Sequence, residues 1–149
     1  MAIDFAEAHL ARSRLRNVTF HRAAANALPR DASFDFVLTW DCLHDMSDPA
    51  GAMRAIRAAI KPDGTWLIVD INGMPTPEEN YAHPLGGFLY SISVLDCLAR
   101  STYEEGGAGL GTLGLPEPVA REMTAQAGFT QFTVLDFGNP LNSFYEVRP

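Results

Sequence analysis

The sequence has few cysteines and few positive charges. It contains 2 cysteines and 11 lysines and arginines, against 18 aspartates and glutamates. Cys42 and Cys97 form no CxxC pair, so we expect two reduced thiols in the core and no disulfide framework. The histidines show no spacing typical of metal ligands, and no metal site is predicted. The net charge of -7 and the lack of any basic run argue against a nucleic-acid partner.

Long hydrophobic runs are also lacking. No segment approaches the ~20 consecutive apolar residues that a membrane-spanning helix needs. The N-terminus has no cationic head followed by an apolar stretch, so no secretion signal is predicted. We therefore expect a soluble, cytoplasmic protein without a membrane partner. What is present is an ordinary globular composition, 47% hydrophobic and 19% charged, in 149 residues, which is the usual length of one domain.

Two apolar segments that end in polar residues are the most informative feature. Residues 34–40 are followed by Asp-Cys-Leu-His-Asp-Met, and residues 65–71 are preceded by Lys-Pro-Asp-Gly. Between them, a helix start at Ser47-Asp48-Pro49 precedes apolar residues at helical spacing. Strand, helix and strand in this order predict two buried parallel strands joined by a right-handed crossover, with residues 61–64 as a tight turn.

The remaining segments complete an α/β pattern. We expect helices over residues 3–15, 83–100 and 116–127, and strands over residues 17–22, 129–137 and 143–147. The last two strands are joined by a short connection and can only be antiparallel. The predicted fold is a truncated doubly wound, mostly parallel sheet with a C-terminal antiparallel strand pair, in a single domain over residues 1–149 with a looser insertion at about 72–116.

This order resembles the class I S-adenosylmethionine-dependent methyltransferase fold from its third strand onward. The resemblance rests on residues 17–29, 35–46 and 61–64 and on Ala127-Gly128-Phe129. The Asp-Cys-Leu-His-Asp-Met run is also similar to the methyltransferase half of bacterial proteins that carry a winged-helix region, which have small-molecule O-methyltransferases among their relatives. The resemblance places the family's Gly-rich cofactor loop and ribose-binding acid before Met1. It therefore implies a fragment with S-adenosylmethionine as cofactor and a small-molecule acceptor, weakly active or inactive alone.

Candidate catalytic and substrate residues lie where the two central strands end, because the carboxyl ends of parallel strands line the ligand crevice. His44 could be a general base for a nucleophilic hydroxyl, or could pack beneath the loop. Asp41 could orient cofactor or substrate, or cap the short turn after it. Asp45 could orient His44 or cap the next helix. Asp70 could contact the substrate, or simply close its strand.

The resemblance implies further contacts. It assigns cofactor binding to Trp40, to Asp41 and to the segment Ala24, Ala25 and Asn26, which stands where many relatives have an aspartate that accepts from the adenine amino group. The lost side-chain contact costs ~1 kcal/mol. Tyr103, in the insertion, is assigned to the acceptor pocket. Trp40 could instead fill the core, since buried aromatic side chains are common there.

Residues 109–114 spell GxGxxG, yet no strand is predicted before them. The motif binds phosphate only between a strand and a helix, so we expect a flexible loop. The same argument disfavours a nucleotide-dependent oxidoreductase. The alternative to a methyltransferase is a non-catalytic binding module whose exposed sheet edge is covered by a partner chain or a homodimer mate.

Overall fold

The computed structural model describes residues 2–149. In chain order the elements are α1 (Ala2–Arg12), η1 (Ala25–Ala27), β1 (Phe34–Trp40), η2 (Leu43–Asp45), α2 (Pro49–Ala59), β2 (Ile60–Ile71), α3 (Pro77–Tyr81), α4 (Gly86–Ile92), η3 (Ser93–Cys97), α5 (Leu98–Ser101), α6 (Glu117–Gln126), β3 (Gln131–Leu135) and β4 (Asn142–Arg148). Of the short helices, η1 and η2 are 3₁₀ helices and η3 is a π-helix.

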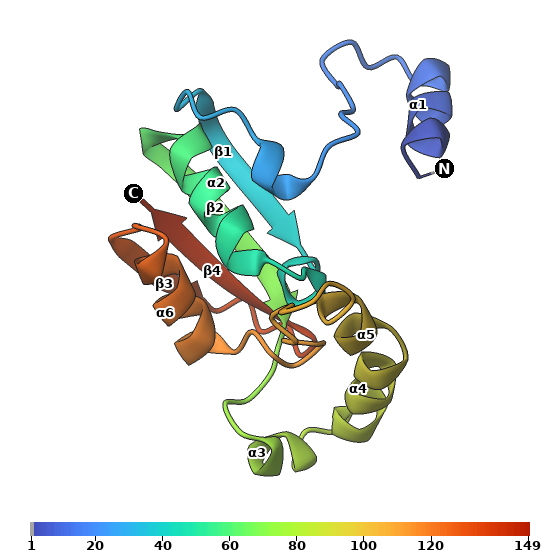
Figure 1. Cartoon of the computed structure of the whole chain (residues 1–149), viewed down its shortest axis with the longest axis vertical. Helices are drawn as coiled ribbons and strands as arrows, with labels where there is room; N and C mark the ends of the chain where they lie inside the picture. The colour runs from blue at the N-terminus through green and yellow to red at the C-terminus, as the bar shows by residue number, and fades with distance from the viewer. Residues whose placement is uncertain (1) are drawn as a thin grey trace.

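The four described strands form one mixed sheet in the order β1-β2-β4-β3. β1 pairs with β2 in parallel, while β4 runs antiparallel to both of its neighbours, β2 and β3. β3 therefore points the same way as β1 and β2, and β4 is inserted between β2 and β3 (Figure 1). The predicted fold class is confirmed, including the antiparallel C-terminal pair.

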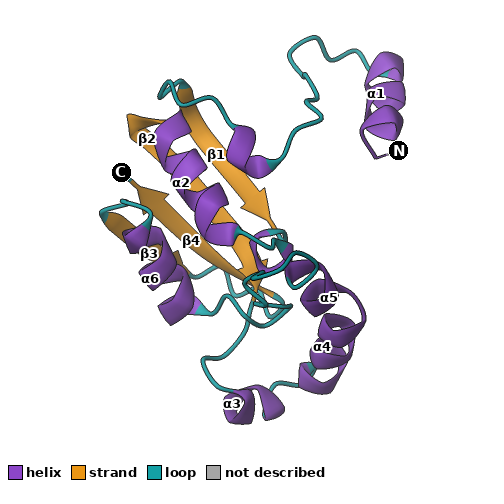
Figure 2. Cartoon of the chain, viewed as in Figure 1, coloured by secondary structure: helices purple, strands orange, loops and turns teal. Residues whose placement is uncertain are grey.

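Two helices, α2 and α6, lie on the same face of this sheet (Figure 2). Asp48 begins α2 by accepting a hydrogen bond from the backbone N–H of Gly51 at 2.7 Å, as the start signal predicted. Trp66 is fully buried in the core between these helices and the sheet, and its Nε1 donates to Thr39 Oγ1 at 3.1 Å. The fully or almost fully buried apolar side chains of this core are Leu43, Met53, Ile56, Ile60, Trp66, Ile68, Leu115, Ala120, Tyr145 and Val147.

The opposite face of β1 is open. Phe36, Leu38 and Trp40 alternate along the strand and are 55%, 49% and 57% exposed, respectively. We predicted that β1 would be buried, and that prediction was wrong. The apolar pattern is present, but β1 is the edge strand of the described sheet and no helix of residues 2–149 covers this face. For the same reason Trp40 does not fill the core; its ring contacts Phe144 edge-on, with 6.4 Å between ring centroids.

The segment before β1 also differs from expectation. Helix α1 ends at Arg12, and Figure 1 shows it separated from the sheet by a long connection. Residues 17–22, predicted as a strand, are loop. A strand is stable only when a neighbour pairs with its backbone groups, and none of the strands in the described part of the chain lies beside this segment.

The predicted turn at residues 61–64 lies inside β2. Phe34 pairs with Ile60 and Phe36 pairs with Thr65, so the intervening residues of β2 bulge out of the ladder. Pairing on both sides of the bulge makes β2 one long strand where we had predicted a turn followed by a strand.

The insertion packs beside the carboxyl ends of β1 and β2 (Figure 2). It contains α3, which the sequence analysis missed although Thr76 and Glu79 form a capping box. The predicted helix of residues 83–100 is confirmed as α4, η3 and α5 in succession, with a widened turn at η3. Among residues 2–149, no helix is long and apolar enough to cross a membrane.

Candidate functional site

Asp41 directly follows β1 and is fixed to the sheet. Its backbone N–H donates to Val69 O at 2.9 Å, and its Oδ1 accepts from Asn142 Nδ2 at 2.7 Å. Its φ of 43° lies in the left-handed region, which turns the chain sharply away from the strand. Asp41 does not cap η2, because the residue at the cap position is Cys42 and that cap has no side-chain hydrogen bond.

His44 and Asp70 form a buried pair between the loop after β1 and the end of β2. The Nδ1 of His44 donates to Oδ1 of Asp70 at 2.5 Å, and the same carboxylate oxygen accepts from Ile71 N at 2.9 Å. His44 is 3% exposed and Asp70 is 0% exposed. The sequence placed both residues at one edge of the sheet, and the structure brings them into direct contact.

Asp45 lies on the other side of the His44 ring. Its Oδ1 is 3.2 Å from His44 Nε2, and its side chain is 28% exposed. Asp45 does not cap α2, since Asp48 does so. Of the two roles considered for Asp45, the structure therefore supports contact with His44.

These acids control the charge of His44. Burial lowers the pKa of His44, but the hydrogen bond and the charge of Asp70, with smaller contributions from Asp45 and Asp41, raise it to above its ordinary value. Burial also raises the pKa of the Asp41 carboxyl, and the charge of Asp70 adds to that rise. His44 in this site therefore keeps its proton more strongly than a histidine side chain exposed to water does.

A loop from the insertion covers His44. The backbone N–H of Gly111 donates to His44 O at 3.2 Å, and that of Ala108 donates to Ser47 O at 2.9 Å. Gly109 and Gly111 have φ of 64° and 68°, which glycine adopts without steric cost. The GxGxxG segment is thus a loop, as predicted. It lies against His44 and does not follow any described strand.

The predicted cofactor segment, residues 24–26, lies beside residues 46–48, which connect η2 to α2. Residues 24–26 line a hollow of about 240 Å³ together with Met46, Ser47, Asp48, Ala52 and Glu104. The structure thus brings the predicted cofactor segment next to the end of the loop that follows β1. Trp40 does not line this hollow.

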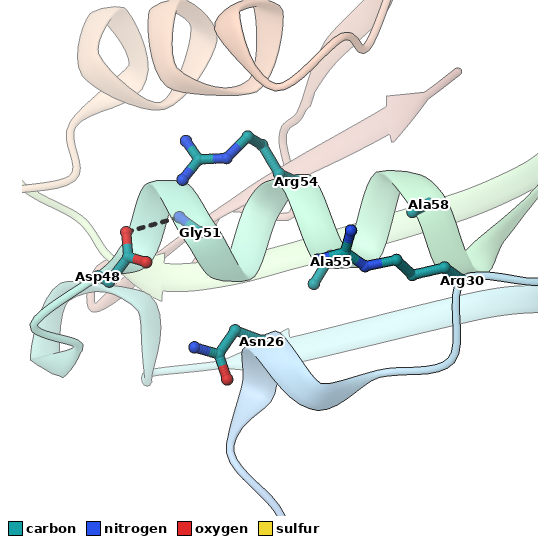
Figure 3. A pocket seen from close by; sticks show the side chains of 7 residues that line it. All are labelled: Asn26, Arg30, Asp48, Gly51, Arg54, Ala55 and Ala58. Atoms are coloured by element: carbon teal, nitrogen blue, oxygen red, sulfur yellow. Dashed lines mark hydrogen bonds between the residues drawn. The ribbon is translucent and has the colours of Figure 1, made fainter.

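A neighbouring hollow of about 340 Å³ shares Asn26 and Asp48 with the first. Figure 3 shows Asn26 across from the first turn of α2, with Asp48 bonded to Gly51. Arg30 and Arg54 contribute guanidinium groups to its walls. The side chains of Asn26 and Asp48 therefore separate two adjacent depressions on this side of α2.

The two predicted substrate residues are not brought together. Tyr103 is 88% exposed and lines a shallow hollow with Ser47 and Leu95, whereas Asp70 is fully buried against His44. Cys97 and Thr112 are buried close to His44 and Asp45, although neither was predicted as a site residue. Nothing in their spacing could have linked residues 50 or more positions apart.

Comparisons with known proteins give consistent matches. Residues 1–98 match the family model described as "Methyltransferase domain". A ubiquinone biosynthesis O-methyltransferase of Stutzerimonas stutzeri (strain A1501) is 31% identical over 110 residues, which cover 68% of this chain and 45% of that protein.

Solved structures share the fold. The S-adenosylmethionine-dependent methyltransferase SibL in its apo form superposes with a TM-score of 0.71 at 19% identity, covering 99% of this chain and 41% of that one. The CMeT domain of the citrinin polyketide synthase gives a TM-score of 0.69 at 15% identity, covering 98% and 36%. The chain therefore spans less than half the length of these relatives.

Proposed function

This chain belongs to the class I S-adenosylmethionine-dependent methyltransferase family, and from that premise we propose that it supplies the acceptor side of a methyltransferase that modifies a hydroxyl group of a small molecule. The observation that carries the proposal is the buried contact between His44 and Asp70 at the carboxyl ends of two parallel strands. Ligands of open α/β sheets bind at this edge.

In the proposed mechanism His44 is the general base. Neutral imidazole accepts the hydroxyl proton at Nε2, while the Nδ1–H stays bonded to Asp70, which fixes the tautomer and stabilises the imidazolium that forms. Asp45 is the partly exposed neighbour of Nε2, so we place the acceptor hydroxyl on that side of the ring. The raised pKa of His44 makes it a stronger base, active at pH values above that pKa.

The residues present fit the adenosine end of the cofactor. Ala24 and Ala25 have small side chains that leave room for a flat purine in the hollow of about 240 Å³, and Asn26 offers amide groups to its edge. In the described residues no glycine-rich turn follows a strand to receive the methionine end. When bound, S-adenosylmethionine supplies the electrophilic methyl group. We therefore expect weak cofactor binding and little turnover by this chain alone.

An NMR titration with S-adenosylhomocysteine tests the cofactor hollow. We expect millimolar binding, with shift changes confined to residues 24–26 and 46–48. Ala24→Leu should abolish these changes by filling the hollow, whereas the matched variant Ala58→Leu, which lies in the neighbouring hollow, should preserve them. Micromolar binding would contradict the expected weakness, and changes elsewhere would refute the assignment.

The base is tested in a complete domain. The N-terminal half of the Stutzerimonas relative joined to this chain should transfer methyl groups from S-adenosylmethionine to a phenolic acceptor. His44→Gln should lower kcat by roughly 10²- to 10⁴-fold, the usual contribution of a general base, without changing cofactor affinity. A hybrid that binds cofactor but transfers nothing, or a His44→Gln variant that keeps full activity, would count against the proposal.

The open face of β1 favours a second candidate function, that of a non-catalytic module held by a partner chain or a second copy. Phe36, Leu38 and Trp40 present apolar surface beside an unpaired strand edge, which soluble proteins usually cover. Light scattering over a concentration series separates the two ideas. A chain that stays monomeric and unfolds in one clean transition would weigh against a required partner.

A further inference from the structure

A cluster of metal-binding groups lies on the Nε2 side of His44. His44, Asp45 and Cys97 each offer one donor atom, and these atoms all lie within 4.8 Å of one another. His44 and Cys97 are 3% and 7% exposed. The donors come from two separate elements, η2 and the π-helix η3, which the insertion packs together.

Buried polar atoms without a hydrogen-bond partner lie in and near this cluster. Within residues 2–149, the buried side-chain atoms that lack a hydrogen-bond partner are Asp45 Oδ1, Asp70 Oδ2 and Thr112 Oγ1. Asp45 and Asp70 both contact the His44 ring, and the Thr112 hydroxyl lies beside Cys97. Buried polar atoms are normally paired. On the Nε2 side of His44, Asp45 Oδ1 and Thr112 Oγ1 therefore keep unused acceptor capacity, whereas Asp70 lies on the Nδ1 side.

The contact between Asp70 and His44 has the form that metal sites use. A metal-binding histidine commonly donates its second ring N–H to a carboxylate, which fixes the tautomer and turns the other nitrogen toward the metal. Here Nδ1 donates to Asp70 at 2.5 Å, and Nε2 faces Asp45. The ring is therefore already oriented for coordination through Nε2.

We propose that His44 Nε2, Asp45 Oδ1 and Cys97 Sγ bind a divalent transition-metal ion of the zinc type. Mixed nitrogen, oxygen and sulfur donors suit zinc and cobalt and are poor for magnesium or calcium. Three protein ligands leave a fourth position for water or for Thr112 Oγ1. Cys97 coordinates as thiolate, so its proton passes to solvent when the metal binds.

The cluster needs a small contraction to close on the ion. Tetrahedral zinc ligands lie roughly 3.5 Å apart, which follows from bonds of about 2.0 to 2.3 Å. The separation of 3.2 Å between Asp45 Oδ1 and His44 Nε2 already meets this spacing. Asp45 has the partly exposed side chain of the three and can move most easily.

Metal and acceptor would compete for the same nitrogen. This consequence rests on the proposed function, because it requires His44 to be the base. The metal site itself does not depend on that function, and it is therefore tested without any measurement of methyl transfer.

Cobalt(II) titration of the purified, reduced chain provides that test. We expect one ion per chain, a thiolate-to-cobalt charge-transfer absorption in the near ultraviolet, and visible bands of tetrahedral intensity. Zinc should displace the cobalt. Cys97→Ser should remove the charge-transfer absorption and weaken zinc binding at least tenfold. Cys42→Ser is the matched control, since Cys42 is outside the cluster, and should leave both signals unchanged.

A second variant guards against misfolding of Cys97→Ser. Asp45→Asn keeps side-chain size and should also weaken zinc binding at least tenfold while retaining the thiolate absorption. The proposal is overturned if the wild-type chain binds no stoichiometric ion, if binding shows no thiolate absorption, or if that absorption survives Cys97→Ser. An absorption lost in Cys42→Ser would also overturn it.

Discussion

Replacing Asp70 by asparagine isolates the charge of the buried pair. The amide has nearly the same shape as the carboxylate, and its oxygen can still accept from His44 Nδ1 in place of the bond at 2.5 Å. The negative charge that holds a proton on imidazole is lost. The variant thus changes the electrostatics of a site that is 3% exposed at His44 while leaving its packing intact.

The expected loss of stability follows from the two kinds of hydrogen bond. A bond to a charged group contributes about 1.5–3 kcal/mol and a neutral one about 0.5–1.5 kcal/mol, so Asp70→Asn should lower the free energy of unfolding by about 1–1.5 kcal/mol. Asp70→Ala removes the partner altogether and should cost about 3–5 kcal/mol. With typical urea m-values, the asparagine variant should shift the midpoint by roughly 0.5–1 M.

The pH dependence gives a sharper readout than the size of the loss. Because the pKa of His44 is raised in the folded protein, its contribution to stability is fully present below its unfolded value of about 6.5. That contribution disappears as the pH rises through the folded pKa. Urea unfolding between pH 5.5 and about pH 9 should therefore show a gap between wild type and Asp70→Asn that narrows at high pH.

Two outcomes would refute this reasoning. A gap that is the same at every pH would mean that the carboxylate does not hold the His44 proton. A variant as stable as wild type at pH 6 would mean that burying Asp70 costs as much as its contact with His44 contributes. Asp31→Asn, which removes an exposed carboxylate from the loop before β1, is the matched control and should change stability by less than about 0.5 kcal/mol.

Three further perturbations test other parts of the structure. Asp41→Ala should lower the free energy of unfolding, measured by urea denaturation, by about 1–2 kcal/mol, because it loses the hydrogen bond from Asn142 and keeps a φ of 43°. Asp41→Gly also loses the bond but adopts that φ without strain, so it should cost about 1 kcal/mol less. Ile68→Ala should cost about 2–5 kcal/mol at this fully buried position, against less than about 1 kcal/mol for Val134→Ala at 44% exposure; equal losses would contradict the described core. Trp40→Lys should reduce any concentration-dependent mass seen by light scattering without lowering stability, and a stability loss above about 2 kcal/mol would show that Trp40 is packed after all.

The elements predicted correctly are those whose sequence signals are local. The crossover from β1 through α2 to β2 follows from two apolar runs, a helix cap at Asp48 and apolar residues at helical spacing. The C-terminal pair follows from a connection too short to allow anything but an antiparallel return. The apolar spacing of residues 83–100 predicted a single helix. It gave no sign of the widened turn at η3.

The wrong predictions concern what lies next to an element. Residues 17–22 have the composition of a strand, but no described strand pairs with them. Phe36 and Leu38 follow the apolar pattern of a buried strand, but no described helix packs over them. Both outcomes depend on neighbours that the segment's own residues do not encode. Burial and pairing are properties of the assembled sheet.

The candidate site was predictable in position but not in its contacts. Strand ends placed Asp41, His44 and Asp70 at one edge of the sheet, because the carboxyl ends of parallel strands share that edge. Which atoms meet there depends on side-chain directions after the left-handed turn at Asp41. Cys97 and Thr112 reach the site through the fold of the insertion, so no spacing rule could have included them.

The place of β4 between β2 and β3 bears on how this chain is made. β3 pairs with β4 alone, and β4 ends at Arg148. During synthesis, β1 and β2 can associate as soon as Ile71 leaves the ribosome, but β3 must wait for the strand that follows it. Until then the β2 edge of the half-built sheet is unpaired and exposed to other nascent chains. A chain cut short before residue 142 contains the β1–β2 pair but lacks the strand that joins it to β3.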